Sequence, residues 1–535
     1  STLLHVLVTN LALRYHPDQL EFYLVDFKKG VEFKTYATHS LPHARAVAIE
    51  SDREFGLSVL ERLDGELRRR GEIFRNLGVQ DVAAFRKTDS NERMPRTLLV
   101  IDEFQELFVE DDKLSQDASL LLDRLVRQGR AFGIHVLLGS QTLGGAYSLA
   151  RSTIGQMAVR IALQCNEADA MLIMGDDNTA ARLLSRPGEA LYNDQSGLLE
   201  GNHPFQIVWL PDHVREHHMR EIESLTAEHN YQPPEPQIVF EGNVPADARR
   251  NTLLANAIEA APASVTHPAP SMWLGDAIAI KEPTAAIFRA QTGTNLLMLG
   301  QQDEAALAMQ AIGLVSLAAQ SPVESSIFYV LDGQAADSPF AGTFENIIRA
   351  MPYDIRLITW HDVPAAMGEM DDMLRERGAR NRADQPPVFL FIYGLQRFRM
   401  LRLEEDFGFT SAMSSNGESE EPAVRPPDKI FGDLLRDGPP LNMHTIAWCD
   451  TVNNLNRNID RKTLREFDMR LLFQMSSTDS SNLIDTPAAS LLGQKRALFH
   501  SEDHGILEKF RPYALPDAAW IESVGKRLRK GQLTS

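Results

Sequence analysis

The stretch Leu98-Leu99-Val100-Ile101-Asp102-Glu103 places four aliphatic residues directly before two acids. A short apolar run that lacks helical periodicity predicts a buried strand, and here the acids stand at the end of that strand. Residues 21–26 and 134–138 form similar runs, and amphipathic helical patterns such as residues 55–77 separate them. Apolar strands that alternate with helices predict a mainly parallel sheet covered by helices. The sequence therefore predicts an α/β fold.

Length and charge limit the classes of function. The chain has 535 residues, with 54 Lys and Arg against 73 Asp and Glu, which gives a net charge of −19. This length suits more than one domain. The charge argues against a protein that coats nucleic acid or acidic membrane with its whole surface, although a local basic track remains compatible with it.

The number of cysteines and the hydropathy of the sequence indicate where in the cell the protein is expected. Cys165 and Cys449 are too few for a disulfide framework or a zinc site, so we expect a reducing compartment, the cytoplasm. The sequence contains no run of about 18 apolar residues that would predict a membrane span. A membrane anchor is therefore expected only upstream of Ser1, if the chain is a piece of a longer protein.

The chain contains an internal repeat with a period near 300 residues. Residues 22–26 are echoed by residues 328–332, and a second match keeps a constant offset of 309 residues, from Arg127 to Arg436 and from His135 to His444. We infer two copies of one α/β unit. They are predicted to cover residues 1–210 and 271–535, with a Pro-rich connecting segment at 211–270 and an irregular insertion at about 403–429.

Four aliphatic residues followed by Asp102-Glu103 form the Walker B pattern of P-loop ATPases. In that pattern Asp102 holds the water shell of Mg²⁺, and Glu103 orients or deprotonates the water that attacks the γ-phosphate. A strand that ends in two solvated acids is the plainer interpretation. The second copy has Tyr393-Gly394 in place of the acids, and neither residue can hold metal or activate water. We expect that copy to be catalytically inactive and to serve in docking, regulation or ring building.

Ser1 and Thr2 stand directly before an aliphatic helix. This position fits the end of a Walker A loop, G-x-x-x-x-G-K-[ST], in which Ser1 and Thr2 bind nucleotide and Ser1 ligates Mg²⁺. A helix that simply begins at a serine cap is the alternative. In the second copy the same spacing, counted from Gly300, places residues 305–307, Ala-Ala-Leu, where Gly, Lys and Ser or Thr belong. The repeat thus predicts a phosphate loop just upstream of Ser1, and its loss from the second copy.

Five segments together resemble the FtsK/SpoIIIE/HerA family of ATPases. They are residues 25–30, 99–104, 130–141, 160–163 and 181–192. The resemblance covers about residues 1–210 and, more faintly, the second copy. It implies two tandem RecA-like P-loop NTPase cores that use ATP and Mg²⁺. It also implies ATP hydrolysis, usually by a hexameric ring of identical subunits that moves a polymer through its pore.

The resemblance assigns roles to two polar residues near the acids. Gln141 ends the strand after the Walker B strand, where family members place a residue that senses the γ-phosphate. Lys28 follows Asp26 by two positions, and the second copy keeps the acid as Asp332 but has no base there. We therefore expect Asp26 to be structural and Lys28 to be functional.

Three arginines are candidates for the trans-acting arginine that reaches a neighbouring subunit's ATP: Arg127, Arg130 and Arg160. The second copy keeps an arginine opposite Arg127 and Arg160 but has Pro439 opposite Arg130. Because the second copy is expected to be inactive, this difference favours Arg130 as the residue tied to catalysis.

The resemblance leaves the substrate open. Most family members move double-stranded DNA, and residues 183–192 resemble the DNA-pumping members, so we expect a DNA translocase first. The EccC-type ATPases of type VII secretion carry tandem, often degenerate cores and handle secreted proteins. Residues 26–30 and 102–104 look like that branch, and the net charge of −19 counts against DNA. A non-hydrolytic scaffold is the third possibility.

Overall fold

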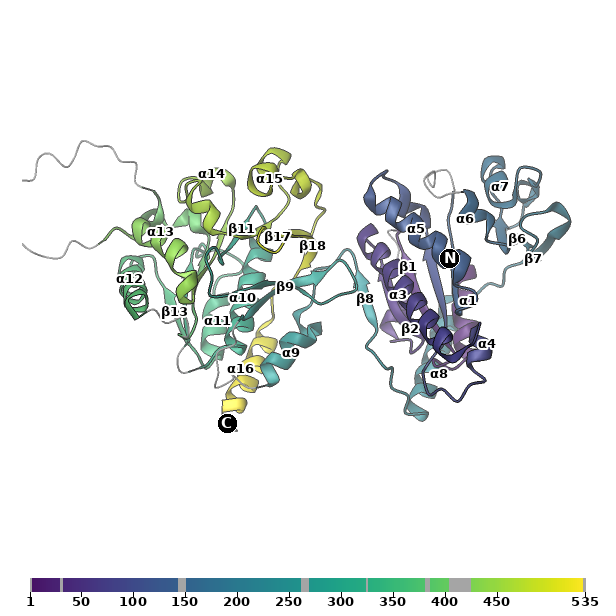
Figure 1. The fold of residues 1–535 in the computed structure, drawn as a ribbon, viewed down its shortest axis with the longest axis horizontal. Helices are drawn as coiled ribbons and strands as arrows, with labels where there is room; N and C mark the ends of the chain where they lie inside the picture. Colours follow the sequence, from purple (N-terminus) through teal and green to yellow (C-terminus); the bar gives the residue numbers. More distant parts are fainter. Residues whose placement is uncertain are drawn as a thin grey trace, which may run out of the picture. The chain divides into compact units, whose positions relative to one another are not determined.

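A computed structural model describes residues 2–28, 32–142, 151–260, 269–323, 326–380, 385–403 and 425–532. The chain divides into two units. Unit 1 comprises Ser1–Asn243 with Ile278–Ile280, and unit 2 comprises Val244–Ala277 with Lys281–Ser535. Each unit is built on its own central sheet (Figure 1).

In the described part of unit 1, five strands form a sheet in the order β4-β3-β1-β2-β8. All neighbouring strands run parallel. Parallel strands covered on both faces require apolar side chains at successive positions, which explains the continuous apolar runs of the sequence. The strands are β1 (Leu20–Asp26), β2 (Ala44–Ile49), β3 (Arg96–Asp102), β4 (Ile134–Leu138) and β8 (Ile238–Glu241).

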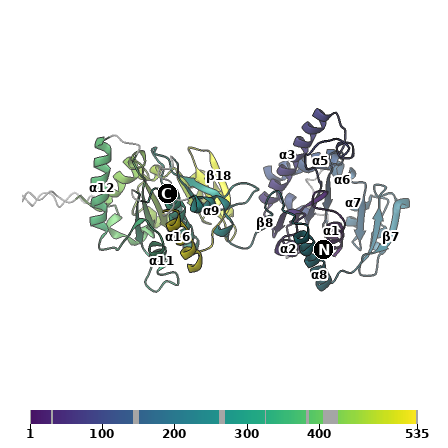
Figure 2. The ribbon, with the colours of Figure 1, turned by 90° about the horizontal axis from the view of Figure 1, so that it is seen from below.

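Helices cover both faces of this sheet (Figures 1 and 2). On one face α3 (Arg53–Leu77) and α5 (Lys113–Gln128) pack with Val25 and Ile101. On the other face α1 (Thr2–Arg14) and α8 (Asp212–Glu228) pack with residues that include Leu24 and Val100. Because side chains alternate along a strand, Asp26 and Asp102 lie on the same face as Leu24 and Val100, the face covered by α1.

The other elements of unit 1 include a small antiparallel sheet in the order β5-β6-β7. The remaining helices and strands of this unit are α2 (Lys34–Thr38), α4 (Val82–Phe85), α6 (Arg151–Gly155), α7 (Glu167–Met174), β5 (Arg160–Leu163), β6 (Glu189–Asn193) and β7 (Asn202–Gln206).

Residues 211–270, which we expected to be a connecting segment, instead contribute regular elements to both units. Helix α8 and strand β8 belong to unit 1, whereas α9 (Thr252–Glu259) belongs to unit 2. Buried apolar side chains explain the difference, because Met219 of α8 and Phe240 of β8 are nearly inaccessible to solvent. The Pro-rich stretch only links α8 to β8. Most of the expected insertion at 403–429 lies outside the described residues.

In the described part of unit 2, ten strands form one sheet in the order β10-β9-β18-β17-β16-β11-β15-β14-β12-β13. The six strands from β16 to β13 in this order run parallel, and the others join antiparallel. The strands are β9 (Ser271–Ala277), β10 (Thr284–Ile287), β11 (Leu296–Leu299), β12 (Ile327–Asp332), β13 (Asp354–Ile358), β14 (Val388–Tyr393), β15 (Met443–Cys449), β16 (Met469–Leu472), β17 (Ala497–Ser501) and β18 (Ile506–Pro512).

Two hydrophobic cores cover the faces of this sheet. Helix α10 lies buried in one core together with side chains of α9, α11 and α16, and α12, α13 and α15 contribute to the other. The helices are α10 (Asp303–Ala319), α11 (Thr343–Ala350), α12 (Val363–Arg380), α13 (Pro427–Asp437), α14 (Val452–Leu455), α15 (Ser477–Ile484) and α16 (Ala518–Gln532).

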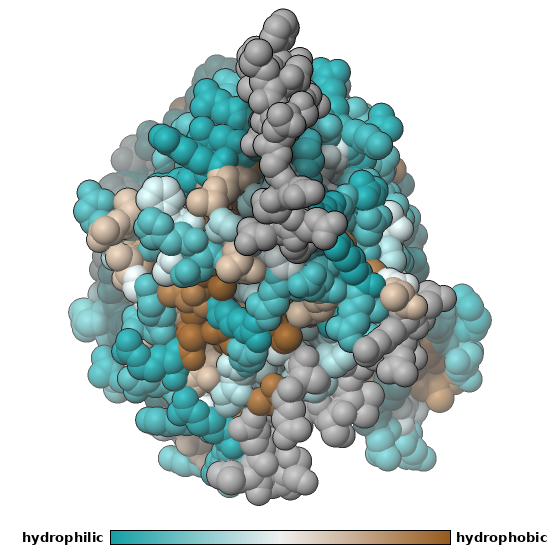
Figure 3. Space-filling view, turned by 90° about the vertical axis from the view of Figure 1, so that its left-hand side faces the viewer, coloured by the Kyte–Doolittle hydropathy of each residue, from teal (hydrophilic) through white to brown (hydrophobic). Residues whose placement is uncertain are grey.

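The two sheets share a strand order, β4-β3-β1-β2 in unit 1 and β15-β14-β12-β13 in unit 2. The expected α/β class with mainly parallel, helix-covered sheets is confirmed. Among the described residues, no helix is both long and apolar enough to span a membrane. Figure 3 views the side that carries α12, where hydrophilic side chains predominate and hydrophobic ones gather in a small area.

Candidate functional site

The two acids of the Walker B pattern lie at the carboxyl end of β3. Asp102 is the last residue of the strand, and Glu103 follows in the left-handed backbone region with φ of 55°. Few residues with a Cβ adopt this conformation, and strained residues of this kind cluster at functional sites. Both side chains are mostly buried. The chain thus turns sharply and leaves the two acids at the edge of the sheet.

The Glu103 carboxylate is held in place by two donors. Its Oε2 atom accepts a hydrogen bond of 2.7 Å from the Gln105 side-chain amide and one of 3.1 Å from the Gln141 backbone N–H. Ser140 Oγ donates in turn to Gln105 Oε1 at 2.7 Å. The carboxylate therefore has a fixed position between the chain that follows β3 and the chain that follows β4.

Close approach of β4 to Asp102 depends on a glycine. A Cβ atom built on Gly139 would lie 2.8 Å from Asp102 Oδ1, closer than real Cβ contacts allow. Burial raises the pKa of Asp102, and the neighbouring Glu103 adds to the rise. A cation bound at this edge would favour the ionised form of Asp102.

Asp26 lies beside Asp102, because β1 and β3 pair in register with these two residues opposite each other. Asp26 is fully buried, and its Oδ1 atom accepts a 2.9 Å hydrogen bond from the backbone N–H of Lys28. Burial raises the pKa of Asp26 to about 7. The hydrogen bond from Lys28 opposes this rise, and the nearby charge of Asp102 adds to it. The sequence predicted the strand end but not its position next to the Walker B acid.

The other expected site residues lie in different places. Thr2 is the first residue of α1, and Ser1 lies outside the described residues. Lys28 and Gln141 are exposed at the carboxyl edge of the sheet, and each directs its backbone N–H to an acid. The structure therefore brings Asp26, Lys28 and Gln141 to the same edge as the two Walker B acids.

Arg127 and Arg130 are not brought to this edge. Arg127 is exposed near the end of α5, where it forms a 2.9 Å ion pair with Asp123. Arg130 is exposed in the turn that precedes β4, whereas the residues after β4 lie next to Glu103. Since β3 and β4 run parallel, Arg130 lies at the opposite edge of the sheet from the acids of its own unit.

The guanidinium of Arg160 donates hydrogen bonds to backbone carbonyls. It donates to the carbonyl oxygens of Ile173 at 2.9 Å and Met174 at 3.2 Å, the last two residues of α7. In unit 2, Arg470 donates in the same way to the Leu483 carbonyl near the end of α15. Side chains of this kind satisfy the last carbonyls of a helix. Arg160 and Arg470 therefore make the same kind of contact in the two copies.

In unit 2, aromatic side chains lie at the equivalent of the Walker B edge. The rings of Tyr393 and Trp448 stack with centroids 4.6 Å apart. Tyr393 Oη donates to the Asp303 carbonyl at 3.2 Å, and Trp448 Nε1 donates to the Gly300 carbonyl at 3.1 Å. The first turn of α10 carries Asp303 and Glu304. These acids oppose the attraction of a helix N-terminus for phosphate.

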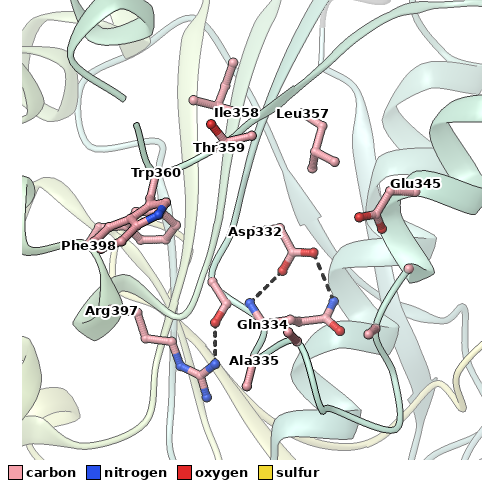
Figure 4. A pocket seen from close by; sticks show the side chains of 14 residues that line it. Asp332, Gln334, Ala335, Glu345, Leu357, Ile358, Thr359, Trp360, Arg397 and Phe398 are labelled. Carbon is pink, nitrogen blue, oxygen red and sulfur yellow. Dashed lines mark hydrogen bonds between the residues drawn. The ribbon is translucent and has the colours of Figure 1, made fainter. Parts of the chain in front are cut away.

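A pocket of about 450 Å³ lies in unit 2 at the same edge of the sheet (Figure 4). It opens at the carboxyl ends of β12 and β13, with Trp360 exposed and Phe398 buried. Arg397 Nη1 donates to the Gly333 carbonyl at 2.5 Å. The labelled residues that line the pocket are Asp332, Gln334, Ala335, Glu345, Leu357, Ile358, Thr359, Trp360, Arg397 and Phe398.

A glycine distinguishes this pocket from the same place in unit 1. Phe27 follows Asp26 in unit 1, and its ring is so close to Gly56 that a Cβ atom there would lie 2.5 Å from it. Gly333 follows Asp332 in unit 2, where a Cβ atom would lie 2.5 Å from the Tyr393 carbonyl oxygen. The large side chain that packs in unit 1 is therefore missing from the equivalent position in unit 2.

Comparison with known proteins supports the sequence resemblance. The FtsK/SpoIIIE family model matches residues 1–144. The ESX-5 secretion system protein EccC5 of Mycobacterium tuberculosis is 31% identical over 188 residues, 33% of this chain and 13% of that protein. The DNA translocase FtsK of Streptococcus pyogenes is 26% identical over 213 residues, 38% of this chain and 25% of that protein. This chain thus spans a small part of the length of these relatives.

Two solved structures resemble both units of this chain. The cytoplasmic domain of the Thermomonospora curvata type VII secretion ATPase EccC aligns with a TM-score of 0.64 and 19% identity, over 99% of this chain and 62% of that one. ATPases 2 and 3 of the same EccC, in complex with a signal sequence peptide, align with a TM-score of 0.51 and 14% identity. This alignment covers 96% of this chain and 86% of that one. These matches show that the chain has the fold of tandem P-loop ATPase domains, and residues 1–144 match the FtsK/SpoIIIE family.

Proposed function

We propose that unit 1 hydrolyses ATP with Mg²⁺ and that the chain uses this energy to move a protein substrate in a type VII-like secretion system. The observation that carries the hydrolytic part is the arrangement of Asp102 and Glu103. Two acids at the carboxyl end of a buried strand, one of them fixed by two donors, suit a site that holds a cation and positions a water molecule.

Magnesium and ATP fit the residues present at this edge. Carboxylate oxygens are the ligands that Mg²⁺ prefers, and Asp102 would hold its water shell, with Thr2 at the start of α1 on the nucleotide side. When bound, Mg²⁺ neutralises charge on the phosphates. Glu103 would accept a proton from the attacking water or orient it, and Gln141 would contact the nucleotide from the adjoining chain.

The tandem organisation favours a protein substrate. EccC aligns over both units, whereas the match to the DNA translocase FtsK covers 213 residues. Unit 2 has an aromatic pair in place of the acids, and its pocket exposes Trp360 beside the buried Phe398. The signal peptide bound to the EccC neighbour supports our proposal that unit 2 recognises a segment of the secreted protein.

We also propose that the chain acts in the cytoplasm as a homo-oligomeric ring. The position of Arg130, exposed and remote from the acids of its own unit, supports a role in which it reaches the ATP of a neighbouring subunit. Arg160 is the least suited of the three arginines, because carbonyls of α7 occupy its guanidinium.

Movement of double-stranded DNA is the second candidate function, favoured by the similarity to FtsK. An ATPase assay on the protein at its natural length separates the two. Under the secretion proposal, the carboxyl-terminal peptide of a secreted substrate stimulates turnover, and linear duplex DNA at low salt neither binds nor stimulates. Stimulation by DNA that falls steeply with added salt would instead support the DNA translocase.

A further inference from the structure

The Asp26 carboxylate has one oxygen atom that its own chain leaves without a donor. Oδ1 accepts the Lys28 backbone N–H, but among the described residues nothing donates to Oδ2. The side chain is fully buried. A buried carboxylate oxygen without a partner destabilises a folded protein, so such groups are rare unless a ligand or ordered water satisfies them.

Unit 2 shows how a purely structural version of this aspartate is satisfied. Asp332 ends β12 as Asp26 ends β1, and Gln334 stands where Lys28 stands in unit 1. Gln334 donates its backbone N–H to Asp332 Oδ1 at 2.9 Å and its side-chain amide to Oδ2 at 3.3 Å. The unit without Walker B acids therefore satisfies both oxygens internally, whereas the unit with those acids leaves one open.

The open oxygen belongs to the nucleotide edge of unit 1. Asp26 pairs in register with Asp102, and both side chains extend from the face of the sheet that α1 covers. Asp26 is closed to bulk solvent, so only a small donor that is bound at this edge can reach it. A water molecule coordinated to a divalent cation is such a donor, because it is small and its hydrogen atoms carry extra positive charge.

We propose that Asp26 is a third carboxylate of the nucleotide site, and that its Oδ2 atom accepts a hydrogen bond from a water molecule of the same hydrated Mg²⁺ that Asp102 holds. Asp26 acts as a positioning residue, since it orients the hydrated cation and does not touch the reacting phosphate. This role rests on the proposed ATPase function of unit 1, and it replaces the structural role that the sequence suggested for Asp26.

Binding of a fluorescent, non-hydrolysable ATP analogue, titrated with Mg²⁺, tests the role in the protein at its natural length. The Asp26→Asn side chain has the same shape but loses the charge and can turn an N–H toward the cation. We expect this variant to need at least about tenfold more Mg²⁺ for half-maximal binding. With a chelator present, it should bind the analogue like wild type and show an unchanged or higher melting temperature.

Asp332→Asn is the matched control, because it changes the equivalent residue in unit 2 and should leave the Mg²⁺ midpoint unchanged. An Asp26→Asn midpoint equal to that of wild type would overturn the proposal and return Asp26 to a structural role. Equal shifts in both variants would also overturn it. If wild-type protein shows no Mg²⁺-dependent binding, the ATPase function of unit 1 fails first, and this inference fails with it.

Discussion

The Glu103 carboxylate accepts the backbone N–H of Gln141 at 3.1 Å, so the residue that follows β3 is tied to the chain that follows β4. These two strands are neighbours in the sheet although more than thirty residues separate them in the sequence. The Gln105 side chain supplies the second donor to Glu103. An acid held by two donors at a strand end is preorganised to bind one water molecule in one place.

Glu103→Gln should abolish ATP hydrolysis and preserve ATP binding. The amide keeps the size and an oxygen that can accept the Gln141 N–H, but it cannot take a proton from water. Loss of a general base lowers turnover by about 100-fold or more. Phosphate release measures the rate, and fluorescent nucleotide measures binding. Glu106→Gln, at an exposed position in the short helix that follows β3, should behave as wild type. Wild-type turnover by Glu103→Gln would remove Glu103 from the catalytic site.

Gly139→Ala should impair Mg²⁺-dependent nucleotide binding. Its Cβ would lie 2.8 Å from Asp102 Oδ1, so either Asp102 or the start of the loop after β4 must move. We expect the Mg²⁺ midpoint of nucleotide binding to rise, since the acid loses its position. Gly65→Ala is the control, because it lies in α3 with no atom within 4 Å of the new methyl group. That change should stabilise the helix by about 0.5–1 kcal/mol. An unaltered midpoint in Gly139→Ala would show that Asp102 does not hold the cation.

Unit 2 should bind no nucleotide, so equilibrium dialysis should find one nucleotide for each chain. The stacked rings of Tyr393 and Trp448 occupy the edge where unit 1 carries its acids, and Asp303 and Glu304 repel phosphate. Trp448→Ala should destabilise unit 2 by about 3–5 kcal/mol, because the buried indole packs on Tyr393 and donates to Gly300. It should not change ATP hydrolysis by unit 1. A stoichiometry of two would contradict this account of unit 2.

Local sequence pattern was enough to predict the strands and the acids at their ends. Strand β3 reads as aliphatic residues followed by Asp102 and Glu103, and nothing outside that run is needed to place the acids at a sheet edge. The repeat predicted that unit 2 had lost its acids, since Tyr393 and Gly394 align with them. Pairing between strands that are distant in the sequence was harder to predict. Only the register of β1 against β3 brings Asp26 beside Asp102, and no local pattern reports that register.

Strand β8 and the environments of Arg130 and Arg160 also depend on contacts between distant parts of the chain. Strand β8 is a four-residue edge strand after a Pro-rich stretch, too short to produce a clear alternation, so the sequence suggested a connector. Arg130 and Arg160 look alike as candidates in sequence. Their environments differ because Arg130 lies in an exposed turn and the guanidinium of Arg160 reaches the carbonyls at the end of α7. Those carbonyls lie 13 and 14 residues further along the chain, so only the fold identifies them as partners.

The stability of unit 1 should fall between pH 7 and pH 5 because of His43. This residue is buried before β2, and His43 Nε2 donates to the Tyr15 carbonyl at 2.7 Å when the ring is neutral. Burial lowers the pKa of His43 to about 4, and the nearby His16 lowers it further. The hydrogen bond to the Tyr15 carbonyl acts in the opposite direction. Nothing among the described residues accepts a hydrogen bond from His43 Nδ1, the atom that would gain the proton.

The stability falls in acid because the folded and the unfolded chain bind protons differently at His43. Between about pH 6.5 and pH 4 the unfolded chain binds a proton at His43 and the folded unit does not, so acid favours unfolding. From pH 7 to pH 5 this residue alone should lower the free energy of unfolding by about 2 kcal/mol. His43→Gln can keep a donor to Tyr15 but cannot titrate, so its stability should fall less over the same interval. Hydrogen exchange of the β1 and β2 amides, compared between wild type and variant at each pH, reports this difference. Parallel losses of stability in the two proteins would show that His43 is already charged in the folded unit.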